Sequence, residues 1–322
     1  MKLKKIDGKT IIKFALNYGI YIFLLVACLI LTLTTDSFLT KTNLVNILLQ
    51  TSIIATMAIG VTFVLITGNN DLSMGSVMAI SSAVGVGMIK ILGMPWWLGM
   101  IAMLVVSVVF GIINGALVAS LKIPAFLATL STQFIARGLT LVISGGSSWF
   151  NLPRAFVAIA AGSIAGIPVI IVTVLVLYIM FHLRLKHTIF GRRIYAVGSS
   201  RESARVSGIN VKKTIILAYI QCGLLVGIAS ILQSARMNSF WAAMGTGLEF
   251  QAIAGAIIGG TSMSGGVGKL AGTFAGVMLM GVINNALNLY GVDANWQEAA
   301  RGFVILIAIV VDAIRQRYST VE

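Results

Sequence analysis

Long apolar segments, separated by short polar stretches, dominate the pattern of this chain. Ten segments are candidate membrane-spanning helices, by the length of apolar sequence that a bilayer requires. They are residues 14–33, 44–67, 72–92, 96–119, 124–143, 166–183, 214–234, 251–263, 269–290 and 299–314. The eighth is too short to cross a bilayer alone, so we expect a half-helix there or a helix that extends back through Leu248. Residues 149–165, between the fifth and sixth segments, are expected to form an interfacial or partly re-entrant segment.

Composition supports this pattern. Hydrophobic residues make up 58% of the chain, charged residues only 10%, and the mean hydropathy is +1.00, which lies outside the range of soluble domains. Hydrocarbon forces backbone polar groups to be satisfied within each helix. The prediction is therefore an all-α polytopic membrane protein with about ten transmembrane helices, forming one transmembrane domain over residues 1–322. Cys28 and Cys222 lie inside apolar segments and are expected to act as small core hydrophobes.

The basic residues predict the orientation. With the N-terminus inside, the inner sections carry 17 Lys and Arg residues and the outer sections carry 5, as the positive-inside rule requires. Both termini are therefore expected in the cytoplasm, and the first apolar segment is expected to be an uncleaved helix. The five tryptophans fall at predicted outer ends, where indole rings favour the interface. Because the basic residues sit at the ends of apolar segments, they indicate orientation and lipid contact, and no nucleic-acid partner is expected.

The longest polar run is a predicted cytoplasmic loop over residues 184–213. From 182 to 213 it carries eight Lys and Arg residues against one acid, Glu202. Ser199 and Glu202 have the spacing of a capping box, residues 201–206 would form a short helix, and Gly208 would end it. A loop that needed only positive charge would not require these features, so we expect a docking surface.

The polar stretch at residues 67–76 lies between two apolar segments. Asp71 is expected either to cap the third helix, with Ser73 and Ser76 in its first turn, or to contact a substrate. The glycine-rich stretch 265–269 lacks the residues and the βαβ context of a nucleotide-binding loop, so a tight turn is expected there. This chain therefore contains no Walker motif, and no catalytic residue is assigned. His182 and His187 have no third ligand beside them, and no metal site is predicted.

Polar side chains within the apolar segments usually face a bundle interior or an aqueous path. The alternative is hydrogen bonding between helices, which contributes about 1 kcal/mol each or less. Uncharged amides and hydroxyls suit a neutral hydroxylated solute, while Arg137 is expected to be a structural anchor. The residues assigned to the substrate path are Asn69, Asn70, Asp71, Ser73, Asn114, Thr129, Gln133, Asn284 and Asn285.

Five Gly-x-x-x-Gly pairs have the spacing that lets helix backbones approach closely. They begin at Gly111, Gly162, Gly223, Gly255 and Gly272. Each match is weak alone in a chain with 34 glycines, but together they suit tightly packed helices that slide.

Several motifs resemble those of a known family, the membrane-spanning permease subunits of bacterial ATP-binding-cassette (ABC) sugar importers of the ribose/xylose/autoinducer type. The resemblance covers residues 44–317 and is carried by five stretches. These are Thr67–Ser76, Ile123–Leu130 (IPAFLATL), Ala136–Leu139 (ARGL), Phe190–Ile209 and Gly259–Gly268 (GGTSMSGGVG). One departure lies at Asn69 and Asn70, where the family usually has Gly and Ile.

The resemblance implies an importer of the bacterial cytoplasmic (inner) membrane, built from two permease chains, cytoplasmic ATPases that hold ATP and Mg²⁺, and an extracytoplasmic sugar-binding protein. This chain itself would need no cofactor. The resemblance also implies that residues 190–209 form coupling helices in the ATPase cleft. The residues assigned to this coupling are Gly191, Arg192, Arg193, Tyr195, Ser199, Glu202, Ala204, Arg205 and Gly208.

Two other functions stay open from the sequence. A branched-chain amino-acid permease would share the architecture but would need charged groups or half-helix ends for a zwitterion. An ion-coupled transporter acting alone would need a mid-membrane acid. Asp71 is the only candidate for that acid in the predicted topology, which places it at the inner end of a span.

Overall fold

The computed structural model describes residues 8–319 of the chain, and the side chains of residues 19–307, 309, 310 and 312. Some of the basic residues used to predict orientation therefore lie outside the described side chains: Lys2, Lys4, Lys5, Lys9, Lys13, Arg315 and Arg317. The structure is almost entirely helical, in agreement with the all-α prediction.

Thirteen helices and four two-residue strands follow one another along the described residues. The N-terminal half contains α1 (Gly8–Thr34), α2 (Lys41–Ile66), α3 (Met74–Lys90), α4 (Trp96–Ala119), α5 (Ala125–Ser144), β1 (Trp149–Phe150), α6 (Arg154–Ala161), β2 (Ser163–Ile164) and β3 (Ile167–Pro168). The C-terminal half contains α7 (Val169–His187), α8 (Ile189–Ser199), α9 (Arg201–Val206), α10 (Val211–Met237), β4 (Ser239–Phe240), α11 (Leu248–Ile258), α12 (Leu270–Leu289) and α13 (Ala294–Ser319).

Each predicted span coincides with a helix. Six of the helices, α2, α4, α5, α7, α10 and α12, are long and apolar enough to cross a membrane. Residues 19–34 of α1, together with α3 and α11, form shorter apolar helices. α11 begins at Leu248 and has only 11 residues, as the sequence predicted for the eighth segment. The structure therefore describes a polytopic helical membrane protein.

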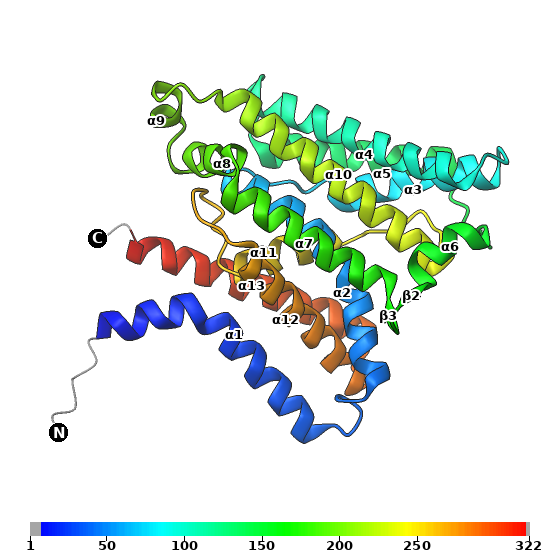
Figure 1. Ribbon diagram of the computed structural model, residues 1–322, viewed down its shortest axis with the longest axis horizontal. Helices are drawn as coiled ribbons and strands as arrows, with labels where there is room; N and C mark the ends of the chain where they lie inside the picture. The colour runs from blue at the N-terminus through cyan, green and yellow to red at the C-terminus, as the bar shows by residue number, and fades with distance from the viewer. Residues whose placement is uncertain (1–7, 320–322) are drawn as a thin grey trace.

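The long helices lie side by side in a slanted bundle (Figure 1), with α8 and α9 at one end and α6 with the β2–β3 hairpin near the other. At this second end, Trp149 of β1 lies opposite Phe240 of β4 in an antiparallel pair, and their ring centroids are 4.8 Å apart. The region 149–165 is thus a folded cap of strands and one short helix. Lys90, at the end of α3, donates to the Asn151 carbonyl at 3.0 Å and fastens the cap to the bundle.

Paired glycines set the closest helix contacts. A Cβ placed on Gly111 of α4 would lie 2.6 Å from the Tyr219 carbonyl oxygen of α10. Reciprocally, Gly223 of α10 lies directly against the Ser107 backbone of α4. The pairs in α11 and α12 meet in the same way, with Gly259 against Gly272. These four Gly-x-x-x-Gly matches are confirmed as packing surfaces because a side chain at either partner would separate the helices.

The fifth pair has no such role. A Cβ on Gly166 would meet no atom within 4 Å, and Gly162 lies against Ala158 and Val169, near in sequence. This match arose by chance in a loop between α6 and α7.

Candidate functional site

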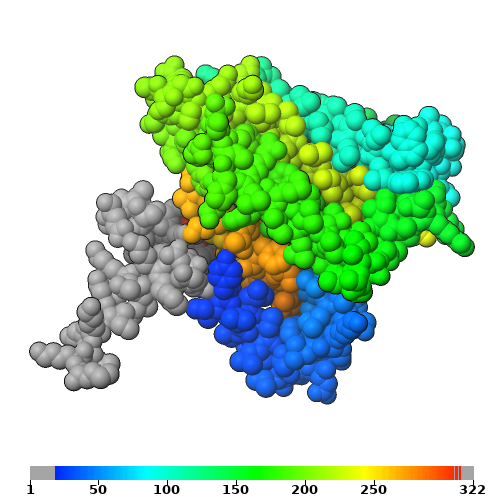
Figure 2. Space-filling view, viewed as in Figure 1, coloured from blue at the N-terminus to red at the C-terminus, as the bar shows by residue number. Residues whose placement is uncertain are grey.

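The α8–α9 segment, residues 189–206, forms a compact pair of helices that projects beyond the long helices (Figure 2). The expected helix at 201–206 is confirmed as α9, and Gly208 follows it with a φ of +77°. The expected cap, however, is wrong by one residue. Ser199 ends α8, and Ser200 caps α9 by accepting a hydrogen bond from the Ser203 amide at 3.2 Å. Serine at both positions left the sequence ambiguous, and the extended backbone of Ser200 selects it as the cap.

One face of α8 anchors the segment to the bundle. Phe190 stacks on Phe63 of α2, with centroids 6.3 Å apart, and the Arg184 guanidinium lies 4.8 Å from the Phe190 ring centroid. Gly191 lies against the Leu185 carbonyl and leaves no room for a side chain. Tyr195 donates to the Gly268 carbonyl at 2.7 Å, and burial raises the pKa of this phenol, which favours its protonated, donating form.

The expected coupling residues therefore divide into two groups. Gly191 and Ala204 are buried and Tyr195 is half-buried, so these three brace the segment. The others are exposed and available to a partner: Arg192, Arg193, Ser199, Glu202, Arg205 and Gly208. Glu202 and Arg205 form an ion pair at 2.6 Å, and each side chain is more than two-thirds exposed.

A polar contact links α9 to the segment between α2 and α3. Arg201 donates from Nη2 to Asn69 Oδ1 at 3.0 Å, and Asn69 in turn donates to the Thr67 hydroxyl at 2.9 Å. Tyr219 of α10 donates to the Asn70 carbonyl at 2.6 Å. Asn69 and Arg201 also line a cavity of about 400 Å³ together with Lys122 and Ala125, the first residue of α5. Asn69, expected on the substrate path, thus contacts the expected coupling segment and also lines this cavity, and its place on the path stays a prediction.

Asp71 lies in a buried hydrogen-bond network that we call the Asp71 network: Asp71, Ser73, Asn114 and Thr132. Asp71 Oδ1 accepts from the Ser73 amide at 2.9 Å and from its hydroxyl at 2.6 Å. Asn114 donates to the Ser73 hydroxyl at 2.8 Å, and Thr132 donates to Asn114 Oδ1 at 2.7 Å. Asp71 shapes the turn before α3, whereas the expected capping of the first helical turn is absent, because the N-cap Ser73 makes no such side-chain bond.

A second buried acid was missed by the sequence. Glu249, in the first turn of α11, is 2% exposed, and its Oε1 accepts from Gln133 Nε2 at 3.3 Å. Its Oε2 and the Oε1 of Gln133 have no hydrogen-bond partner among the described residues. Arg137, one turn along α5 from Gln133, donates to the carbonyls of Ala242 at 2.6 Å and Met244 at 3.0 Å, as expected of a structural anchor.

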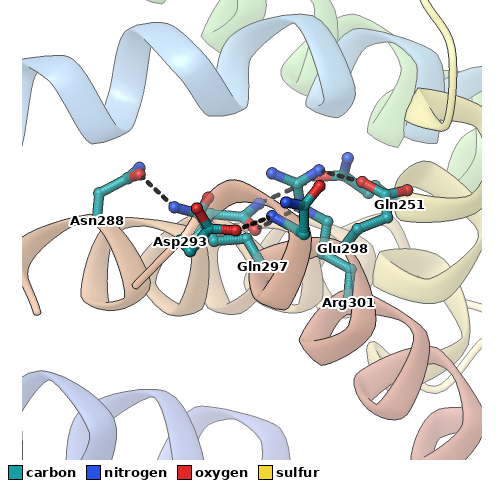
Figure 3. A network of polar contacts seen from close by, with 8 residues as sticks. Gln251, Asn288, Asp293, Gln297, Glu298 and Arg301 are labelled. Atoms are coloured by element: carbon teal, nitrogen blue, oxygen red, sulfur yellow. Dashed lines mark hydrogen bonds and ion pairs between the residues drawn. The ribbon is translucent and has the colours of Figure 1, made fainter. Parts of the chain in front are cut away.

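Asn284 and Asn285 belong to other clusters. Asn284 donates to Gln251 of α11 at 3.1 Å and accepts from Arg301 of α13 at 3.2 Å. Figure 3 shows this network, in which Arg301 also forms an ion pair with Glu298 of the same helix, α13. Asn285 pairs with Asn43 of α2 through two hydrogen bonds of 2.7 and 3.1 Å.

The expected path residues are thus not brought together in one channel. They fall into the Asp71 network, the Glu249–Gln133 pair and the clusters on α12, while Asn69 and Asn70 contact α9 and α10. Thr129 is fully buried and bonds to its own helix at Ala125. Sequence reasoning missed Glu249 because the eighth segment was started at residue 251. A lone acid next to an apolar run was the available signal. It missed Arg201 and Thr132 because no local pattern marks their distant partners.

The long apolar helices, their glycine-lined contacts and the exposed short helices α8 and α9 describe a polytopic helical membrane protein. Residues 43–309 match the family model described as branched-chain amino acid transport system / permease component. The chain belongs to this family of permease components.

Its relatives include permeases of sugar transport systems. It is 37% identical over 308 residues to the ribose import permease of Escherichia coli strain K12, covering 92% of this chain and 93% of the relative. It is 34% identical to the D-allose transport system permease of the same strain, covering 92% of each chain. It is 33% identical to the L-arabinose transport system permease of that strain, covering 94% of this chain and 92% of the relative. No solved structure matches the chain significantly. The resemblance to sugar permeases is confirmed, and the chain is a multi-pass protein of a bacterial inner membrane.

Proposed function

We propose that this chain is the permease subunit of an ABC importer that carries a sugar or sugar-like solute into the cytoplasm. The observation that carries this is the contact between Arg201 of the exposed α9 and Asn69 of the buried α2–α3 segment, in a chain whose relatives are sugar permeases. The family model's description names branched-chain amino acids, but the relatives that align over nine-tenths of the chain import sugars. Sugar is therefore the better-supported solute.

The driving force would come from a separate ATPase, which holds ATP and Mg²⁺. Its cleft would receive the exposed coupling residues on α8 and α9, and its closure would move this segment against the bundle. Arg201 and Asn69 would transmit that movement to Asp71 and to the start of α3. Helix α3 would then tilt relative to α4. Alternating access to the two sides of the membrane follows from this tilt.

The ten-span topology with both termini in the cytoplasm is part of the proposal. It is supported by the basic α8–α9 end lying opposite the tryptophan-bearing cap of β1 and α6. An extracytoplasmic binding protein would deliver the solute to the cap end. A second permease chain, identical or related, would complete the path.

An ion-coupled transporter acting alone is the competing function, and Glu249 supplies the buried acid that it would need. The two functions differ in their energy source. Cells that carry the complete operon should take up labelled D-ribose, D-allose or L-arabinose, and uptake should stop when ATP is depleted with arsenate. Uptake that survives ATP depletion but stops when a protonophore collapses the proton gradient would contradict the ABC assignment.

The coupling role has its own test. Replacing Glu202 and Arg205 together by alanine should abolish uptake while the chain still inserts and the ATPase still hydrolyses ATP. Lys212→Ala is the matched control: Lys212 is an exposed cation in the first turn of α10, within the same polar stretch of sequence. This variant should take up sugar normally. Normal uptake by the double variant would reject the coupling assignment.

A further inference from the structure

The Glu249–Gln133 pair presents two buried oxygens without donors. Glu249 Oε2 and Gln133 Oε1 are both inaccessible to solvent and unpartnered in the described part of the chain, although the two side chains contact each other. A buried acceptor without a donor costs about 1–3 kcal/mol, and more when it is charged. Two such atoms on side chains that contact each other indicate that a donor to this pair is missing.

No described hydrogen bond from the protein reaches either oxygen, although the Glu249 carboxylate lies near the backbone amides of Gly247 and Glu249 and near the charge of Arg137. Arg137 is the cation closest in sequence to Gln133. One of its guanidinium nitrogens, Nη1, donates to two backbone carbonyls, those of Ala242 and Met244. No ion pair joins it to Glu249 among the residues described. Nor do those residues include a cluster of His, Cys, Asp and Glu side chains able to hold a metal ion. The missing donor is therefore expected to come from a ligand.

The position of the pair suits a transported ligand. Glu249 opens the half-length α11, and Gly75 in the first turn of α3 faces it, so that a Cβ on Gly75 would overlap Glu249 Oε2 and the Gly245 carbonyl. The N-termini of two short helices thus meet at a point with no side chain between them. In transporters such half-helix ends mark solute sites. The contact closes over the carboxylate here, and separation of α3 from α11 would expose it.

We propose that Glu249 and Gln133 form a binding site for hydroxyl groups of the transported sugar, uncovered when α3 and α11 move apart. Both free atoms are acceptors, and a sugar offers several hydroxyl donors close together. The Arg137 charge near the carboxylate disfavours a cation in the same place. This inference rests on the proposed function and assigns to it a residue, Glu249, at a specific step.

The test compares a sugar with its analogues that lack one hydroxyl. Cells with the complete operon are given the sugar they import, chosen among D-ribose, D-allose and L-arabinose, and each of its monodeoxy analogues. A site that bonds a hydroxyl discriminates strongly against the analogue without it. In wild-type cells, the sugar should be taken up at least 10-fold faster than at least one of its monodeoxy analogues. Glu249→Gln should lower this ratio of uptake rates at least threefold. The binding protein is the same in both strains, so its own preference cancels in this comparison.

Controls separate the possible failures. Glu298→Gln alters an exposed carboxylate and should keep the wild-type preference. Gln133→Leu is a second variant of the site. It should also lower the ratio of uptake rates, for the analogue that lacks the same hydroxyl or a neighbouring one. An unchanged preference in Gln133→Leu, or in a Glu249→Gln chain that transports normally, overturns the inference while sugar import stands. Uptake of no sugar by wild type, with uptake of leucine, overturns the proposed function itself.

Discussion

Two carboxylates in this protein, those of Asp71 and Glu249, are both buried at the start of a helix but differ in their hydrogen bonding. Asp71 precedes the first turn of α3 and is 4% exposed, and Glu249 lies in the first turn of α11 and is 2% exposed. Asp71 Oδ1 accepts two hydrogen bonds from Ser73, whereas Glu249 accepts one long bond from Gln133 at Oε1 and none at Oε2 among the described residues. Buried charges are tolerated when they are fully hydrogen-bonded. The comparison separates a carboxylate that holds the fold from one that is available to a ligand.

The two sites are also connected differently. The Asp71 network continues along the chain through Asn69 to Arg201 at the projecting end of the bundle, and sideways through Asn114 to Thr132 on α5. Glu249 contacts Gln133 of the same α5 helix. Helix α5 therefore has a side-chain hydrogen bond to α4 through Thr132, and the next residue, Gln133, bonds to Glu249. In the proposed mechanism, a movement that starts at α9 would pass from Asn69 to Asp71 and from Thr132 to Gln133 along the backbone, and between these points through the hydrogen bonds of the Asp71 network.

The largest expected effect comes from removing the satisfied carboxylate. Asp71→Ala leaves the Ser73 amide and hydroxyl without their acceptor inside the bundle, and should lower the free energy of unfolding by about 3 kcal/mol. Thermal unfolding of the detergent-solubilised chain measures this. Asp36→Ala, which removes an exposed acid between α1 and α2, should leave the transition unchanged. Equal unfolding temperatures for both variants would show that Asp71 is not a carboxylate on which the fold depends.

A smaller effect is expected at the far end of the same network. Thr132→Val removes the hydroxyl that donates to Asn114 Oδ1 at 2.7 Å and should destabilise the chain by about 1–2 kcal/mol. Ser131→Ala is a matched control because Ser131 is exposed and bonds only to its own helix at Leu127. The comparison predicts that the two neighbouring hydroxyls differ clearly in the thermal transition. A larger loss from Ser131→Ala would contradict the assigned network.

The connection to α9 can be cut at the residue where this chain departs from its family. Asn69→Gly removes the acceptor of Arg201 and should cost about 1 kcal/mol of stability. Its main effect should be on coupling, so that more ATP is hydrolysed for each sugar molecule imported. The ratio of hydrolysis to uptake in proteoliposomes of the complete complex measures it. An unchanged ratio would show that movement reaches α3 by another contact, such as that of Gly198 with Ile66.

The smallest stability effect is expected at the unsatisfied acid. Glu249→Gln removes a buried charge that no described ion pair compensates, so the free energy of unfolding should change by less than about 1 kcal/mol, or rise. The same detergent unfolding experiment as for Asp71 gives the direct comparison. A loss as large as that of Asp71→Ala would identify Glu249 as a second structural carboxylate.

Much of the helical pattern could be predicted from local sequence. The span predicted at 96–119 coincides with α4 to the residue, and α9 was placed correctly from its capping pattern even though its cap was assigned to Ser199 in place of Ser200. Apolar runs of this length can only be helices in a membrane, and polar or proline-bearing stretches end them. The candidate site was predicted less well. Glu249 was overlooked, and the path assigned to Asn69 and the other polar residues stays a prediction.

The sequence by itself determined the class of protein, the helices and the charged segment that ends in α9, because hydrophobic length and capping act over a few residues. The tertiary structure alone decided which polar groups are satisfied. Asn114 finds Ser73 across 41 residues, Gln133 finds Glu249 across 116, and Arg201 finds Asn69 across 132. Such pairs depend on how helices pack, with glycines setting the closest approaches, and periodicity along the chain does not encode them. The distinction between Asp71 and Glu249 exists only in the packed bundle.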